Sequence, residues 1–138
     1  MTLSAVALLG LIAWTLLLVV LLVSQRGLWV LSGKMAVNAF RADGSNAPSA
    51  FGQRLVRAHA NCLENLPLQA GVLLYAMVTA QTALTDPLAL TLLAARLIQS
   101  FMHLLSTHPL FVWLRFVAFF AQVLILIWWL LQLSGLAG

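Results

Sequence analysis

The sequence predicts an all-α integral membrane protein, a bundle of four transmembrane helices forming one domain over residues 1–138. Of the 138 residues, 63% are hydrophobic and only 7% are charged, and the mean hydropathy is +1.04. A soluble domain of this size needs far more charged residues at its surface. Because a transmembrane helix takes about 20 apolar residues, the chain has room for about four helices and no separate soluble module.

The first helix is expected over residues 3–24. Residues 3–23 carry no charge and are long enough to cross a bilayer. The segment has neither the basic start nor the small-residue cleavage pattern of a secretory signal, so we expect it to be retained. A polar connection with several glycines follows as far as Gln53, and these glycines are expected to break the helix.

The second helix is expected over residues 54–81. Its first turns are polar, and Pro67 is expected to bend it. The third helix is expected over 87–105, with Asp86 as its N-cap and Pro87 at its first position. The fourth is expected over 110–133, with a pair of tryptophans near its far end, where aromatic residues suit a membrane interface.

The distribution of charge predicts the topology. Most basic residues lie in or beside the first connection, and Arg115 follows the third, whereas the second connection carries only Asp86. Because cytoplasmic loops are enriched in Lys and Arg, the first and third connections are expected in the cytoplasm and both termini outside.

Polar residues within the predicted spans gather at one depth, in the cytoplasmic half of the bilayer. The second and third helices each carry three of them on one face, at spacings of three and four, and the fourth helix adds one at a comparable depth: Arg57, Asn61 and Glu64; Arg96, Gln99 and His103; and Arg115. An intramembrane charge costs at least about 2.5–3.5 kcal/mol and normally faces a partner or a wet cavity. Three arginines against one glutamate would be balanced by an anionic ligand.

Simpler structural interpretations remain open for parts of this set. The three residues of the second helix also fit a buried ion-pair network that sets helix register. Arg115 taken alone also fits a side chain that extends to the headgroups.

Several classes of site are excluded. Cys62 is the single cysteine, so neither an intrachain disulfide nor a multi-cysteine metal site is possible, and we interpret it as a buried small hydrophobe. We expect no metal site, because no zinc ligand set is present, and we find no nucleotide-binding glycine loop or catalytic triad. Nucleic acid is not an expected partner, because there is no soluble basic face.

The segment Arg57-Ala-His-Ala-Asn61-Cys-Leu-Glu64-Asn-Leu-Pro67 resembles the second-helix signature of the MAPEG family, the membrane-associated proteins in eicosanoid and glutathione metabolism. The resemblance covers essentially the whole chain. It implies a homotrimer that binds glutathione between neighbouring subunits, in the cytoplasmic half of the membrane.

The resemblance also implies roles for individual residues. Arg57, Asn61 and Glu64 would hold the charged ends of glutathione, with arginine on carboxylate and glutamate on ammonium. The third helix would add polar contacts from Arg96, Gln99 and His103. Arg115 would be the catalytic residue that stabilises the thiolate, and Arg26 would close the site from the adjacent subunit.

Departures from the family pattern narrow the expected activity. Eicosanoid-handling relatives carry tyrosines where this chain has Asn65, Gln99 and His103, and Phe116 and Phe119 occupy positions that can be Ser or Tyr. These differences argue against a specialised prostaglandin or leukotriene synthase. The sequence resembles the compact prokaryotic members of the family more closely. This resemblance predicts that the protein lies in the inner membrane.

The resulting function prediction is a glutathione-dependent transferase or peroxidase. Its partners would be glutathione as co-substrate, a lipophilic electrophile or lipid hydroperoxide arriving from the bilayer, membrane lipids, and further copies of the chain. One alternative is a non-catalytic lipid-binding or scaffold protein on the same fold. Another alternative is a small transporter. Arg96 argues against it, because a positive charge near the bilayer midplane would obstruct the passage of cations.

Overall fold

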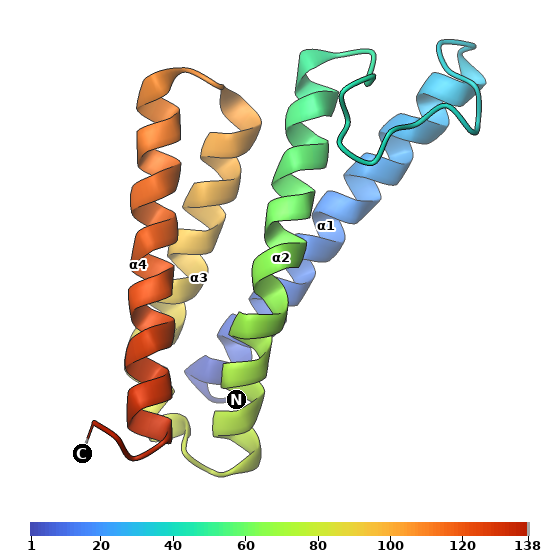
Figure 1. The fold of residues 1–138 in the computed structure, drawn as a ribbon. Helices are drawn as coiled ribbons and strands as arrows, with labels where there is room; N and C mark the ends of the chain where they lie inside the picture. The colour runs from blue at the N-terminus through green and yellow to red at the C-terminus, as the bar shows by residue number, and fades with distance from the viewer. Residues whose placement is uncertain (138) are drawn as a thin grey trace.

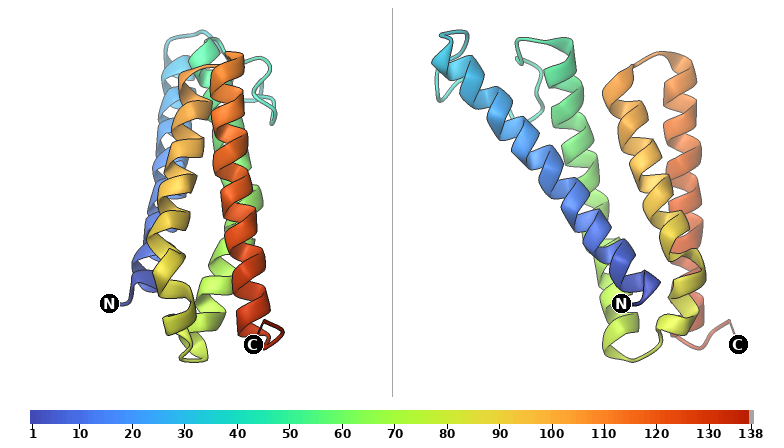
Figure 2. Two further views of the ribbon diagram at one scale, coloured as in Figure 1. Left: turned by 90° about the vertical axis from the view of Figure 1, so that its left-hand side faces the viewer. Right: turned by 180° about the vertical axis from the view of Figure 1, so that it is seen from behind.

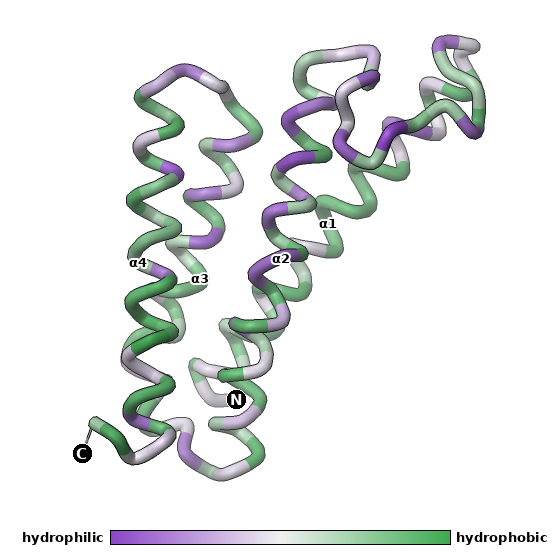
Figure 3. Tube along the Cα trace, in the orientation of Figure 1, coloured by the Kyte–Doolittle hydropathy of each residue, from purple (hydrophilic) through white to green (hydrophobic). Residues whose placement is uncertain are grey.

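The computed structural model describes residues 1–137, which form four helices. Helix α1 spans Leu3–Leu31, α2 spans Ala50–Val78, α3 spans Thr82–Leu105 and α4 spans Pro109–Leu133. In this described part of the chain, three helices (α1, α3 and α4) are long and apolar enough to cross a membrane. The hydrophilic residues concentrate in the first half of α2 and in the connection before it (Figure 3), so a fourth span remains a prediction.

The helices run antiparallel to their chain neighbours. The α1–α2 and α3–α4 connections lie at one end of the molecule, and both termini lie at the other end with the α2–α3 connection (Figure 1). α4 packs mainly against α3, whereas α1 packs against α2 and α3. Seen from behind, α1 tilts away from the other helices towards its C-terminal end (Figure 2). This arrangement brings the polar half of α2 to the same end as the start of α4.

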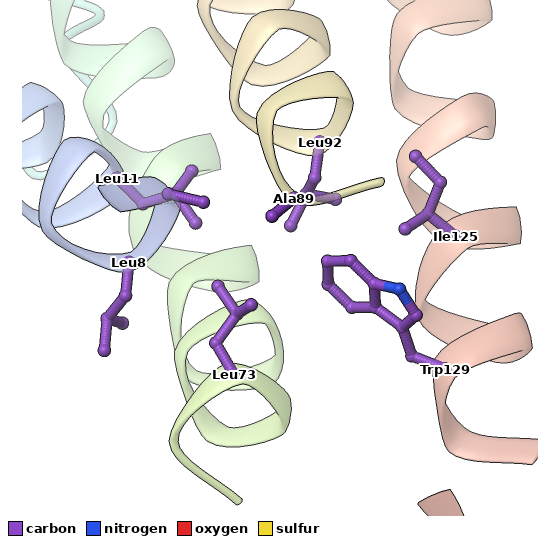
Figure 4. Close-up of a cluster of buried hydrophobic side chains, with 8 residues drawn as sticks. Leu8, Leu11, Leu73, Ala89, Leu92, Ile125 and Trp129 are labelled. Atoms are coloured by element: carbon purple, nitrogen blue, oxygen red, sulfur yellow. The ribbon is translucent and has the colours of Figure 1, made fainter. Parts of the chain in front are cut away.

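Two apolar clusters hold the helices together. The cluster near the termini takes side chains from all four helices and includes the fully buried Trp129 (Figure 4). The second cluster lies towards the other end and takes its members from α1, α2 and α3: Leu18, Leu22, Leu55, Val56, Ala58, Cys62 and Leu104. The start of α4 contributes no member to this second cluster, which leaves room between α4 and α2 at that end.

The end of α1 differs from the prediction. Gly27 was expected to break the helix, but α1 continues through it to Leu31 and ends before Gly33, whose φ is +79°. A single glycine costs a helix interior only about 1 kcal/mol, and the apolar residues after Gly27 continue the helix. α2 likewise starts earlier than expected, because the Ser49 side chain caps it by accepting a hydrogen bond from the Gly52 N–H at 3.0 Å.

The predicted N-cap role of Asp86 is wrong. α3 begins at Thr82, and Pro87 lies inside it, where it removes one helical hydrogen bond. Asp86 instead binds the start of α1: its carboxylate accepts from the Ser4 N–H at 2.8 Å and from the Ser4 hydroxyl at 2.6 Å. Thr2 is the N-cap of α1, and Asp86, although distant in sequence, satisfies a further free N–H in the first turn of this helix.

Candidate functional site

The polar face of α2 opens to the outside of the protomer. Arg57 and Glu64 are exposed and Asn61 is half-buried, so the two charged residues do not form the buried ion pair considered from the sequence. They share one side of α2 because steps of four and three residues return to the same helical face. Asn65, one turn after Asn61, donates its amide to the Asn61 carbonyl at 2.9 Å.

Arg96 lies behind this face and is only 2% exposed. It donates to Asn61 Oδ1 at 2.7 Å, to Gln99 Oε1 at 2.8 Å and to Cys62 Sγ at 3.2 Å. Gln99 also donates to Asn61 Oδ1, at 3.0 Å. The Arg96 guanidinium is thus held by neutral acceptors from α2 and α3, and it orients Asn61 and Gln99.

Two glutamines that the sequence analysis did not single out extend this network. Gln122 of α4 donates to Gln99 Oε1 at 2.8 Å, and Gln69 of α2 donates to Gln122 Oε1 at 2.8 Å. Both glutamines are buried. Gln122 stands alone in an apolar stretch between Arg115 and Gln132, and an isolated amide in a membrane helix is a signal of interhelical hydrogen bonding. The network connects α2, α3 and α4 at the level of the site.

Cys62 is buried as predicted, but its surroundings are not purely apolar. Besides the contact from Arg96, its sulfur lies 3.3 Å from the Ser100 hydroxyl. The side chain therefore belongs to both the apolar cluster and the polar network.

Between α2, α3 and the start of α4 lies a cavity of ≈ 440 Å³, here called the α4 cavity. Its lining residues are Arg57, Asn61, Gln99, His103, Val112, Arg115, Phe116 and Phe119. Arg57 and Arg115 bring two guanidinium groups to it, and no lining residue is a carboxylate. Phe116 and Phe119 form an apolar wall. The cavity therefore suits an anionic group attached to an apolar one.

A second cavity of ≈ 370 Å³, the loop cavity, lies where the α1–α2 connection passes α2. Its lining residues are Ala42, Asp43, Val56, Arg57, Ala60, Asn61, Glu64 and His103. The two cavities share Arg57, Asn61 and His103. Six of the eight predicted site residues thus line one or both cavities, while Arg96 lies behind their wall.

Arg26 lies apart from the other predicted site residues within one protomer. It is near the C-terminal end of α1, where its guanidinium stacks over the Phe40 ring at 5.1 Å from the centroid. This cation–π contact joins α1 to the connection that follows it.

A third cavity, of ≈ 420 Å³, lies near the other end of α2 and α4 and is almost wholly apolar. We call it the apolar groove, and its lining residues are Pro67, Leu68, Gly71, Val72, Tyr75, Leu130, Leu133 and Ser134. Across residues 1–137, no three His, Cys, Asp or Glu side chains lie close enough together to hold a metal ion.

Comparison with known proteins gives one match. The model of the MAPEG family matches residues 4–135, nearly the whole chain. No curated protein and no solved structure matches it. The family includes glutathione transferases and related proteins, and its members use glutathione. The match across all four helices, together with helices apolar enough to span a membrane, identifies the chain as an integral membrane protein that belongs to the MAPEG family.

Proposed function

We propose that this protein is a glutathione-dependent membrane transferase or peroxidase that acts on lipophilic electrophiles or lipid hydroperoxides. The observation that carries the proposal is the α4 cavity, where Arg57 and Arg115 come together with no carboxylate in the lining. Glutathione carries two carboxylates and a thiol that becomes anionic on reaction, so it fits a site with excess positive charge.

Arg115 is the residue that activates the thiol. A fixed guanidinium in a partly dry cavity favours the thiolate over the thiol, and the thiolate is the nucleophile. In conjugation, the thiol proton goes to water, the sulfur forms a bond to the electrophilic carbon, and the leaving group departs with the bonding electron pair. With a hydroperoxide, two glutathione molecules are oxidised to the disulfide while the hydroperoxide is reduced to an alcohol and water.

The remaining polar residues hold the peptide. Arg57 binds a carboxylate and Glu64 binds the ammonium group. Asn61 and His103 supply hydrogen bonds along the shared wall, and Gln99 supplies them in the α4 cavity. Arg96 is a positioning residue, because it lines neither cavity and donates hydrogen bonds to Asn61 and Gln99. The apolar co-substrate enters from the bilayer along the phenylalanine wall.

The assembly we propose is a homotrimer. Arg57 and Glu64 are exposed on α2, and leaving them against hydrocarbon would be costly, so a neighbouring copy covers this face. The neighbour also supplies its Arg26, which lies far along α1. We propose the inner membrane as the location, with α2 as a fourth span, both termini outside and the two cavities towards the cytoplasm.

The test is a glutathione titration of the detergent-purified protein, followed by the ultraviolet absorbance of the thiolate. Wild type is expected to give a saturable signal that Arg115→Ala abolishes, with conjugation of a general electrophile falling at least about tenfold. Lys34→Ala is the matched control, because it removes a positive charge outside both cavities. Equal conjugation rates in wild type and Arg115→Ala would overturn the catalytic assignment.

The apolar groove favours a second candidate, a non-catalytic lipid-binding or scaffold protein. With only one Ser and one Tyr among its polar lining groups, the groove suits an acyl chain better than a peptide. This candidate predicts binding of a fluorescent fatty acid without any thiolate signal. Under it, Glu64→Ala would damage assembly more than any activity.

A further inference from the structure

The two polar cavities differ in charge although they share a wall. The loop cavity brings two carboxylates, Asp43 and Glu64, to one guanidinium, Arg57. The α4 cavity brings Arg57 and Arg115 together with no carboxylate in its lining. The joined site is therefore negative towards the connection and positive towards α4, which matches a ligand with an ammonium at one end and an anionic group at the other.

The connection that carries Asp43 is held closely against α2. Gly44 adopts a φ of +72°, and a Cβ built on it would lie only 2.7 Å from the Val56 Cβ. The Arg41 N–H donates to the Asn46 side-chain oxygen at 3.1 Å, which closes the turn around Asp43. These contacts define the position of Asp43 at the edge of the loop cavity.

The surroundings of Asp43 favour the charged form of its carboxyl group. The Ser45 N–H donates to its Oδ1 at 3.0 Å, and this backbone hydrogen bond holds the pKa of the Asp43 carboxyl below its ordinary value. The Asp43 side chain is exposed. The residue thus brings a negative charge to the cavity without the cost of deep burial.

We propose that Asp43, acting with Glu64, binds a primary ammonium group of the ligand and makes the site select thiol peptides with a free amino group over N-acylated ones. The inference rests on the proposed function and adds Asp43, from the α1–α2 connection, as a residue that determines specificity. An ammonium carries three donors, and two carboxylates from different parts of the chain converge on the loop cavity. Their mutual repulsion is relieved when a cation lies between them. The ligand's anionic end then reaches Arg115 across the shared wall.

The experiment compares glutathione with N-acetylglutathione on the full-length protein in detergent, by calorimetric titration. Wild type is expected to bind glutathione more tightly. Asp43→Asn keeps the side-chain oxygen that accepts from Ser45 but removes the charge. We expect the preference for glutathione to fall about two- to fivefold, as suits a solvent-exposed ion pair, and the affinity for N-acetylglutathione to stay equal or rise.

Asn46→Ala is the matched control, because it loosens the same turn without changing its charge. It is expected to weaken both peptides alike. An unchanged preference in Asp43→Asn, or equal weakening of both peptides, would overturn the role of Asp43 while glutathione binding itself stands. Wild type binding N-acetylglutathione as tightly as glutathione would also overturn it. Binding of neither peptide would overturn the proposed function and this inference together.

Discussion

At the residue scale, the site depends on a buried arginine whose hydrogen-bond acceptors are neutral side chains. Arg96 is nearly inaccessible to solvent, and it donates hydrogen bonds to Asn61, Gln99 and the Cys62 sulfur. A guanidinium presents its donors in a rigid plane, so it can hold two amide oxygens at once. Asn61 and Gln99 both line the α4 cavity, whereas Arg96 does not. Arg96 therefore orients two lining side chains from outside the cavity.

Replacing Arg96 tests this dependence. Arg96→Met removes the donors to Asn61 and Gln99 and leaves each amide oxygen with one remaining donor, from Gln99 and Gln122 respectively, and we expect the lost hydrogen bonds to cost about 1–3 kcal/mol of stability. Thermal unfolding in detergent measures the loss. Arg96→Lys is expected to keep the charge yet weaken glutathione binding while kcat at saturation changes little, because a point charge cannot orient both amides. A lower kcat with unchanged affinity in Arg96→Lys would contradict the positioning role.

At the element scale, the helices are joined by specific polar contacts near their ends. Asp86 and Ser4 join α3 to the start of α1, and Arg54 of α2 donates to the Leu104 carbonyl at the end of α3, at 2.8 Å. In a membrane the hydrophobic effect between helices is weak, so packing and hydrogen bonds decide which helices associate. The two contacts hold α3 at both of its ends.

Removing the contact at the start of α1 is expected to destabilise the bundle. Asp86→Ala deletes the acceptor of the Ser4 N–H, and loss of such a cap costs about 0.5–2 kcal/mol. The measurement is the thermal unfolding midpoint in detergent without ligand. Asp43→Ala, which removes an exposed carboxylate, is the comparison and is expected to change stability by no more than about 0.5 kcal/mol. Equal midpoints for the two variants would show that the Asp86 contact contributes nothing measurable.

At the scale of the whole molecule, one protomer leaves the site open. Arg57 and Glu64 of α2 are exposed, and Arg26 of α1 lines neither cavity and stacks over Phe40. A closed symmetric assembly presents the same pair of surfaces at each interface, so each site can take one residue from a neighbour.

Complementation between inactive variants tests this arrangement. Arg26→Ala and Arg115→Ala are each expected to reduce conjugation when expressed alone. In the proposed homotrimer, the two variants coexpressed in equal amounts would assemble together, and about a quarter of the sites would then pair an intact Arg115 with a neighbour's intact Arg26. We expect activity near that fraction of wild type in the purified mixture. Activity equal to the mean of the two separate variants would place Arg26 outside the shared site.

The sequence by itself determined the helices and the residues of the polar face. Apolar runs of membrane length predicted α1, α3 and α4, and these are confirmed. The family resemblance through Arg57, Asn61 and Glu64 is also confirmed. These features are local or periodic, and spacing along one helix dictates which residues share a face.

Only the tertiary structure decided which polar groups meet. Asp86 is a residue type that often caps its own helix, yet its carboxylate accepts from a free N–H in the first turn of α1, because the packing of α1 against α3 brings the two together. Gln122 lies outside every sequence motif considered, and it joins the polar network behind the site because α4 packs beside α3. In the sequence Asp43 is an ordinary turn residue, and it lines the loop cavity because the neighbouring Gly44 packs against Val56 of α2. Such contacts depend on distances between helices, which the order of residues along the chain does not contain.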